Sequence, residues 1–348
     1  MLSFFNEISV LSLYKHENLV SLLKNCNEGD ELILVYEYEA CGSLDRNLSE
    51  PGLTWARRLK ICVGVAHAIN YLHDPGDTRQ RVLHGDIKSS NIILNADWTA
   101  KVCGLSLSKN VPSYQPETFV ISNAVGTLAY YDPQYIEMGI LSKESDVYSF
   151  GVVLFELMCG KLCFVYSNGQ ILLNKWTRCC EEKRLDEITF SVLKEQMDSC
   201  SLNTFSSLAY RCLKKDREER PSMAEVMKQL EIAVEQQEEF EETMRIQKLL
   251  KSPILNTTQD QNFIRFPNGI LVDDDNTWLA ILKGKVCEVI SATKCISADS
   301  LVHDYTQKSR LISDFLHIYF YIRASSNISC FTLISINCAS FFLIEKES

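Results

Sequence analysis

One short loop restricts this chain more than any other feature of its sequence. Residues 84–91 read His-Gly-Asp-Ile-Lys-Ser-Ser-Asn, a spacing that lets Asp86, Lys88 and Asn91 share one tight turn. There the carboxylate can accept a hydroxyl proton, the ammonium can neutralise a phosphoryl group in transit, and the amide oxygen can bind a metal ion. The loop therefore predicts a phosphoryl-transfer site, with Asp86 as the base, or the remnant of one.

Four further segments accompany this loop in a fixed order along the chain. Residues 34–38 read Leu-Val-Tyr-Glu-Tyr, and residues 126–135 read Gly-Thr-Leu-Ala-Tyr-Tyr-Asp-Pro-Gln-Tyr. Residues 146–157 open with an aspartate and are otherwise mostly apolar, and residues 220–222 read Arg-Pro-Ser. Together the five segments resemble eukaryotic protein kinases of the plant receptor-like serine/threonine class. The resemblance covers about residues 2–235.

The resemblance implies a role for each matching residue. Asp86, Lys88 and Asn91 would be catalytic, and Asn91 would also be a metal ligand. Thr127 would face the substrate and support Asp86. Two of the other positions would be structural: Asp146 would hold the backbone of the loop 84–91, and Arg220 would hold the end of the domain. Glu37 and Glu39 would offer backbone groups to an adenine. Glu7 would belong to a mobile helix, although a plain surface carboxylate is an equal alternative for this residue.

The sequence departs from the family pattern on the side of the nucleotide and the metal. Where the family places the magnesium-binding aspartate, this chain has Gly104, which has no metal ligand. The family's glycine-rich loop and strand lysine, the partner expected for Glu7, have no counterpart before residue 7. ATP and Mg²⁺ are therefore implied as cofactors by the resemblance, but we expect their binding to be weak or lost. Asp97 precedes the relevant strand, so geometry argues against it as a substitute ligand.

Two more departures concern arginines. Gly85 replaces the arginine that pairs with a phosphorylated activation segment in the family. Gln134 replaces the glutamate that pairs with the arginine aligned to Arg220, so we expect a neutral hydrogen bond there instead of an ion pair.

The expected fold class is α+β. It is a protein-kinase-like bilobal fold with a truncated N-lobe, a mostly helical C-lobe and a β-rich C-terminal segment. We expect a kinase-like domain at 1–240, a linker at 241–262 and a partial lectin-like segment at 263–348. The patterns predict helices at 2–13, 54–73, 142–159, 173–180, 205–212 and 222–242, and a strand at 31–38.

The C-terminal segment has a different character. Residues 269–300 resemble the start of a phloem-protein-2-like lectin domain, which implies a β-sandwich able to bind carbohydrate. Trp278 is then either a stacking platform or a core residue. Residues 324–344 are uncharged and long enough to span a bilayer, but they are rich in serine and asparagine. Buried strands or an unfolded tail are the alternatives to a membrane span.

Composition excludes some classes of protein. The net charge of −10, without a basic patch, argues against a nucleic-acid partner. The 14 cysteines show no metal-ligand spacing, and no signal peptide opens the chain. We therefore expect reduced thiols and a cytoplasmic location, with association with the plasma membrane left open.

Three functions remain open on the sequence alone. The first is a catalytically impaired pseudokinase that binds protein partners or peptides as a regulatory module in signalling. The second is an active ATP-dependent serine/threonine kinase that uses Asp86 as base. The third is a carbohydrate-binding protein whose kinase-like part is a relic.

Overall fold

The computed structural model describes residues 2–28, 31–76, 80–112, 115, 118–123, 125–165, 170–250, 264–265 and 271–272. It divides into two units, Met1–Gln247 and Lys248–Ser348, which we describe separately. In the second unit β12 (Ile264–Arg265) pairs antiparallel with β13 (Leu271–Val272). The remaining lectin-like strands, Trp278 and residues 324–344 lie outside the described residues. In the described part of the chain no helix is long and apolar enough to cross a membrane.

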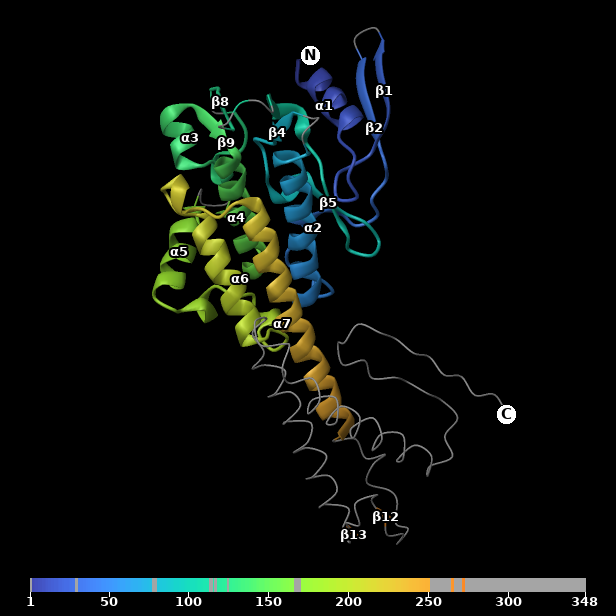
Figure 1. Ribbon diagram of the computed structural model, residues 1–348, viewed down its shortest axis with the longest axis vertical. Helices are drawn as coiled ribbons and strands as arrows, with labels where there is room; N and C mark the ends of the chain where they lie inside the picture. The colour runs from blue at the N-terminus through green and yellow to red at the C-terminus, as the bar shows by residue number, and fades with distance from the viewer. Residues whose placement is uncertain are drawn as a thin grey trace, which may run out of the picture. The chain divides into compact units, whose positions relative to one another are not determined.

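The N-terminal part of the first unit consists of one helix beside one β-hairpin (Figure 1). Helix α1 (Leu2–Leu13) precedes β1 (Leu22–Glu28) and β2 (Glu31–Tyr36), which pair antiparallel. The sequence predicts the strand to continue to Tyr38, but it ends at Tyr36. Three apolar side chains of β2 are at least 40% exposed: Leu32, Ile33 and Val35. Because Leu32 lies on the opposite face of the strand from Ile33 and Val35, the hairpin exposes apolar side chains on both of its faces.

Helices dominate the rest of this unit. Helix α2 (Trp55–His73) begins after Thr54, whose Oγ1 accepts a hydrogen bond from the N–H of Arg57 at 3.4 Å. Helix α4 (Lys143–Cys159) lies at the centre, beside α2 and α6 (Ser199–Cys212) (Figure 1). These helices and α5 (Leu173–Glu181) confirm the predicted ones, although α6 begins earlier than expected.

The last helix is longer than the sequence predicts. Helix α7 runs from Met223 to Leu250, whereas the pattern predicts an end at 242. Its acidic second half still packs on the unit, because Gln237 is fully buried and Lys60 of α2 lies 2.8 Å from Glu238. The expected linker at 241–262 therefore begins inside a helix.

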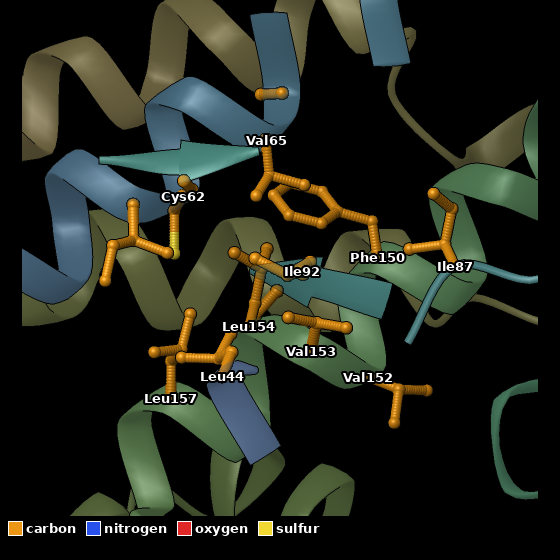
Figure 2. Packing of buried hydrophobic residues seen from close by; sticks show 14 of the residues in the cluster. Leu44, Cys62, Val65, Ile87, Ile92, Phe150, Val152, Val153, Leu154 and Leu157 are labelled. Atoms are coloured by element: carbon orange, nitrogen blue, oxygen red, sulfur yellow. The ribbon is translucent and has the colours of Figure 1, made fainter. Parts of the chain in front are cut away.

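The core lies where α2 and α4 meet the loop at residues 84–91. Figure 2 shows Cys62 and Val65 of α2 facing Phe150 and Leu154 of α4, with Ile87 of the loop close by. All five are at most 1% exposed. The burial of apolar surface stabilises a fold by about 25 cal/mol per Å², and the packing of Ile87 in this cluster therefore supports the loop.

Short strands and turns connect the helices and place the loop. The loop 84–91 lies between β4 (Arg81–Leu83) and β5 (Ile92–Leu94). The sheets are β3-β5-β6, β4-β7, β8-β9 and β10-β11. The other bounds are β3 Gly42–Ser43, β6 Ala100–Val102, β7 Lys109–Val111, β8 Phe119–Ile121, α3 Pro133–Met138, β9 Ile140–Ser142, β10 Phe164–Val165 and β11 Gln170–Ile171. The 3-10 turns are η1 Leu44–Arg46, η2 Ser89–Asn91, η3 Leu105–Leu107, η4 Leu128–Tyr130, η5 Leu185–Glu187, η6 Ser191–Leu193 and η7 Arg217–Glu219.

Candidate active site

One buried carboxylate anchors the loop that carries Asp86. Asp146, in the first turn of α4, is 1% exposed. Its Oδ2 accepts the N–H of His84 and its Oδ1 that of Gly85, both at 2.8 Å. Burial would raise the pKa of Asp146, but the hydrogen bond and charge of His73, with Nε2 at 2.8 Å, hold it below its usual value. Asp146 thus fixes the backbone of the loop, as the resemblance implies.

The structure brings Asp86, Lys88 and Thr127 together. Lys88 Nζ lies 2.7 Å from Asp86 Oδ2 and donates to Thr127 Oγ1 at 2.9 Å. Thr127 Oγ1 in turn donates to Asp86 Oδ1 at 3.2 Å. Because both oxygens of Asp86 already have a donor, the carboxylate is held in place between the loop and the segment that follows residue 126.

Asn91 turns its amide nitrogen towards Asp86. Asn91 Nδ2 donates to the backbone oxygen of Asp86 at 2.8 Å and to Asp86 Oδ2 at 3.0 Å. Both neighbours are acceptors, so the nitrogen and not the oxygen must face them. Asn91 therefore helps to hold Asp86 in place.

Gly104 lies directly against Asn91. It adopts the left-handed conformation, φ 78° and ψ 43°, which glycine enters at no steric cost. A Cβ atom at this position would lie only 2.7 Å from Asn91 Cγ and 2.7 Å from Nδ2. The amide of Asn91 therefore occupies the space into which a larger residue at 104 would extend. The next residue, Leu105, is fully buried, as expected of a side chain that packs the core.

These residues do not fit a magnesium ion. Mg²⁺ needs near-octahedral oxygen ligands, usually including carboxylates. Gly104 supplies none, Asn91 offers one neutral amide oxygen, and the exposed Asp97 lies in the turn between β5 and β6, where its N–H donates to Asn95. Within the described residues no group of three or more His, Cys, Asp or Glu side chains could hold a metal ion.

We expect Gly104→Ala to lower the free energy of unfolding by about 1–3 kcal/mol, since alanine is strained at this φ and its Cβ overlaps Asn91. Equilibrium urea unfolding measures the change. In an Asn91→Ala background the same substitution should cost less, because only the backbone strain remains. Equal costs in the two backgrounds would show that the contact between residues 91 and 104 is unimportant.

Glu7 is buried and paired, so the alternative of a plain surface carboxylate is wrong. It is 7% exposed. Burial and a hydrogen bond with Glu7 both raise the pKa of the Tyr36 hydroxyl. The neighbouring Asn6, which the sequence alone does not single out, donates through Nδ2 to the carbonyl oxygens of Leu105 and Ser108, both at 3.0 Å. Helix α1 is thus fastened to the turn that follows Gly104.

The two glutamates expected beside an adenine share a lysine. Lys101 Nζ lies 2.6 Å from Glu37 Oε2 and 2.7 Å from Glu39 Oε1. The N–H of Glu37 donates to the carbonyl of Ser21 at 3.0 Å, and the carbonyl of Glu39 accepts the N–H of Gly42 at 3.2 Å. The hydrogen bond from Lys101, followed by its charge, lowers the pKa of Glu37. The segment after β2 is thus tied to β6.

The expectation that Arg220 lacks a carboxylate partner is wrong. Arg220 Nη2 lies 2.8 Å from Asp132 Oδ1, and both side chains are fully buried. Asp132 Oδ2 also pairs with Arg217 Nη2 at 2.6 Å. Burial would raise the pKa of Asp132, but its bonds to Arg220 and Arg217 lower it. The available signal is the Asp-Pro pair at the start of a helix, where Asp132 caps the N–H of Gln134 at 3.1 Å.

A second buried network joins the loop to the segment after residue 126. Tyr130 OH donates to Glu156 Oε1 at 2.7 Å and lies 3.1 Å from Ser89 Oγ. Glu156 Oε1 also accepts the N–H of Cys163 at 2.8 Å. Burial raises the pKa of Glu156 to about 7, although these hydrogen bonds oppose the change. With a pKa of about 7, Glu156 is about half protonated near neutral pH.

A pH dependence follows from Glu156. Its pKa is about 7 in the folded state against 4.5 in the unfolded chain, so the folded state binds the extra proton between these values. The contribution of Glu156 to the free energy of unfolding is fully present below about pH 4.5 and is lost as the pH rises to about 7. Above this pH it does not change further. The loss is about 3 kcal/mol. Glu156→Gln should remove this slope in unfolding free energies measured from pH 4.5 to 8, while Glu195→Gln, at an exposed site, should keep it.

Comparison with known proteins agrees with this geometry. The family model of the protein kinase domain matches residues 2–230, and the chain belongs to this family. The receptor-like protein kinase FERONIA of Arabidopsis thaliana is 38% identical over 245 residues, which cover 69% of this chain and 27% of that protein.

Two further relatives from the same organism are similar to the same extent. The receptor-like protein kinase ANXUR1 is 39% identical over 241 residues, 68% of this chain and 28% of the relative. The receptor-like protein kinase THESEUS 1 is 39% identical over 244 residues, again 68% and 28%. The chain thus spans less than a third of the length of these relatives. As a family, protein kinases use ATP and Mg²⁺ and act on protein substrates.

Proposed function

We propose that the chain contains a catalytically impaired, kinase-derived module that binds protein partners or peptides in signalling. The observation that carries this proposal is that Gly104, beside Asn91, provides no carboxylate, so that one neutral amide oxygen is left for a metal ion. Asn91 itself directs its amide nitrogen to Asp86 at 2.8 and 3.0 Å. Since phosphoryl transfer depends chiefly on positioning and charge neutralisation by the metal, we expect ATP and Mg²⁺ binding to be weak or lost.

The peptide-facing side of the site supports a binding role. Asp86, Lys88 and Thr127 form a closed set of contacts at the start of the segment that would face a peptide. The next residue, Leu128, is 67% exposed, although the following Tyr130 is anchored in the core. A rigidly anchored segment that presents an apolar side chain is suited to recognising a partner.

The ten described cysteines are all free, which supports a cytoplasmic location for the module. In this proposal the module corresponds to the expected kinase-like domain at 1–240, extended at its end by the rest of α7.

Incubation with Mg-ATP and a generic serine/threonine substrate tests the catalytic half of the proposal. We expect the chain to incorporate no more phosphate than its Asp86→Asn variant. Incorporation that disappears in Asp86→Asn would establish an active kinase with Asp86 as base and overturn the proposal.

Fluorescence polarisation with a library of serine/threonine-containing peptides tests the binding half. Binding should occur without Mg-ATP and should weaken about tenfold or more in Leu128→Asp, because an anchor residue at an interface contributes about 2 kcal/mol. Ile171→Asp, at a 42%-exposed apolar side chain elsewhere, is the matched control and should bind normally. Equal loss in both variants, or no binding by any peptide, would contradict a peptide-binding role.

A further inference from the structure

A surface cavity of about 650 Å³ lies among the helices of the first unit. Its wall consists of residues of α3, α4 and α5 and of residues from the end of α6 to η7. Helices α3 and α5 lie on the same side of the unit (Figure 1). None of the residues around Asp86 belongs to this wall. The volume is in the range of sites that bind a small molecule or a few residues of a peptide.

Three charged side chains of the wall belong to one chain of contacts. Tyr210 OH donates to Glu181 Oε1 at 2.6 Å, and Lys214 Nζ donates to Tyr210 OH at 3.2 Å. Lys214 Nζ also lies 4.5 Å from the centre of the Tyr210 ring and 3.7 Å from Glu219 Oε2. The hydrogen bond with Tyr210 raises the pKa of Lys214, so its ammonium group stays charged within this set of contacts.

The two other charged side chains of the wall have partners as well. Lys215 Nζ lies 3.7 Å from Glu137 Oε1, and Asp216 Oδ1 accepts the N–H of Glu218 at 3.1 Å. With two lysines against three carboxylates, the wall is close to neutral. The wall therefore does not select a charged ligand of either sign.

Two neutral polar groups of the wall have no hydrogen-bond partner among the described residues: the hydroxyl of Tyr148 and the side-chain amide of Gln134. Tyr148 is only 6% exposed, and the guanidinium group of Arg220 lies over its ring at 5.0 Å. Arg220 pairs with Asp132, which leaves the amide of Gln134 free. Burial raises the pKa of Tyr148 to about 12, so its hydroxyl keeps the proton at neutral pH. A polar group so deeply buried without a partner is rare and calls for a ligand or water.

Apolar side chains complete the wall. Leu213 is 9% exposed, and Leu173 of α5 is partly exposed. A fitting ligand therefore combines an apolar side chain with neutral groups that both donate and accept hydrogen bonds. The backbone of a peptide has this chemistry, because the NH₂ of a glutamine can donate to a backbone carbonyl while its oxygen accepts a backbone N–H.

We propose that this cavity is a docking site for an extended segment of a partner protein, which Gln134 and Tyr148 hold by its backbone. One apolar side chain of the segment packs against Leu173 and Leu213. The site goes beyond the function proposed above and does not depend on it, because binding here uses neither Asp86 nor Leu128.

The test uses the full chain with 3-fluorotyrosine in place of tyrosine, observed by ¹⁹F NMR. The resonance of Tyr148 is assigned through its absence in Tyr148→Phe. The probe is a blocked pentapeptide with leucine between two pairs of alanines, and its analogues carry arginine or glutamate in place of the leucine. We expect the leucine peptide to shift the Tyr148 resonance saturably and to bind about tenfold more tightly than either charged analogue.

Substitutions at the two neutral groups test how the peptide is held. Gln134→Met keeps the length of the side chain but removes its amide, and it should weaken binding of the leucine peptide about tenfold. Tyr148→Phe, followed through the Tyr210 resonance, should weaken binding about fivefold. The matched controls Gln80→Met and Tyr38→Phe, both at exposed positions, should bind normally, and so should Leu128→Asp.

A spin label gives a readout that needs no folded variant. A nitroxide at the end of the leucine peptide should broaden the resonances of Tyr148 and Tyr210 more than that of the exposed Tyr38. Three results would each overturn the proposal: no saturable shift of the Tyr148 resonance, tighter binding of the arginine or glutamate peptide, or unchanged affinity in Gln134→Met.

Discussion

Replacing Asp146 by alanine is expected to lower the free energy of unfolding by about 3–5 kcal/mol, one of the two largest single effects we expect in the first unit. The substitution leaves the N–H groups of His84 and Gly85 without their acceptor and His73 without its partner, all in a buried place. Removing one member of a buried, hydrogen-bonded charge pair typically costs this much. Urea unfolding followed by circular dichroism measures the loss.

The control for Asp146→Ala is Asp97→Ala, which removes an exposed aspartate from a turn and should change stability by less than about 0.5 kcal/mol. Asp146→Asn should fall between the two, since one oxygen remains as an acceptor. A loss below about 1 kcal/mol in Asp146→Ala would contradict the view that this carboxylate holds the loop.

Asp132→Ala is expected to have an effect of similar size, about 3–5 kcal/mol. Its carboxylate pairs with the fully buried Arg220 and with Arg217, and both arginines would keep their charge without it. The substitution also removes the cap of α3, which adds about 1 kcal/mol. The melting temperature should fall accordingly.

An exposed ion pair nearby provides the comparison for Asp132→Ala. Glu137 of α3 lies 3.7 Å from Lys215, and both side chains are more than half exposed. Glu137→Ala should therefore cost no more than about 0.5 kcal/mol. If Gln134 were the true partner of Arg220, Gln134→Ala would be as damaging as Asp132→Ala, a result that the structure does not predict.

Most of the helical architecture could be predicted from the sequence, because it depends on local periodicity and caps. Thr54 caps α2 as predicted, and the apolar run after Asp146 forms the central helix. The length of α7 could not be predicted, since its acidic second half has no clear apolar stripe. The side-chain amide of Gln237 holds this part of the helix against the unit through hydrogen bonds to the backbone of residues 196 and 198.

The candidate site, too, could be predicted from the sequence only in part. The neighbourhood of Asp86, Lys88 and Asn91 follows from their spacing, and that of Thr127 from the resemblance. The direction of the Asn91 amide does not follow from the sequence, because it depends on which atoms surround the amide after folding. Asp132 was missed as the partner of Arg220 because the family pattern places that partner at residue 134, and only the packed structure brings Asp132 Oδ1 to 2.8 Å from Arg220 Nη2.

In the proposed function the missing carboxylate at position 104 would affect the metal and the nucleotide, whereas Asp86, Lys88 and Thr127 remain in contact with one another. Asn91 links these two observations. Its Nδ2 donates to Asp86 Oδ2, and Gly104 leaves the amide the room to lie there. Asp86 thus keeps its position through Lys88, Thr127 and Asn91.

Titration calorimetry of the chain with ATP, with Mg²⁺ and with EDTA, tests this account most directly. Since the residues do not fit Mg²⁺, ATP should bind with the same affinity in Mg²⁺ and in EDTA, or should not bind in either buffer. Mg²⁺-dependent tightening of tenfold or more that disappears in Asn91→Ala would show a working metal site and contradict the account.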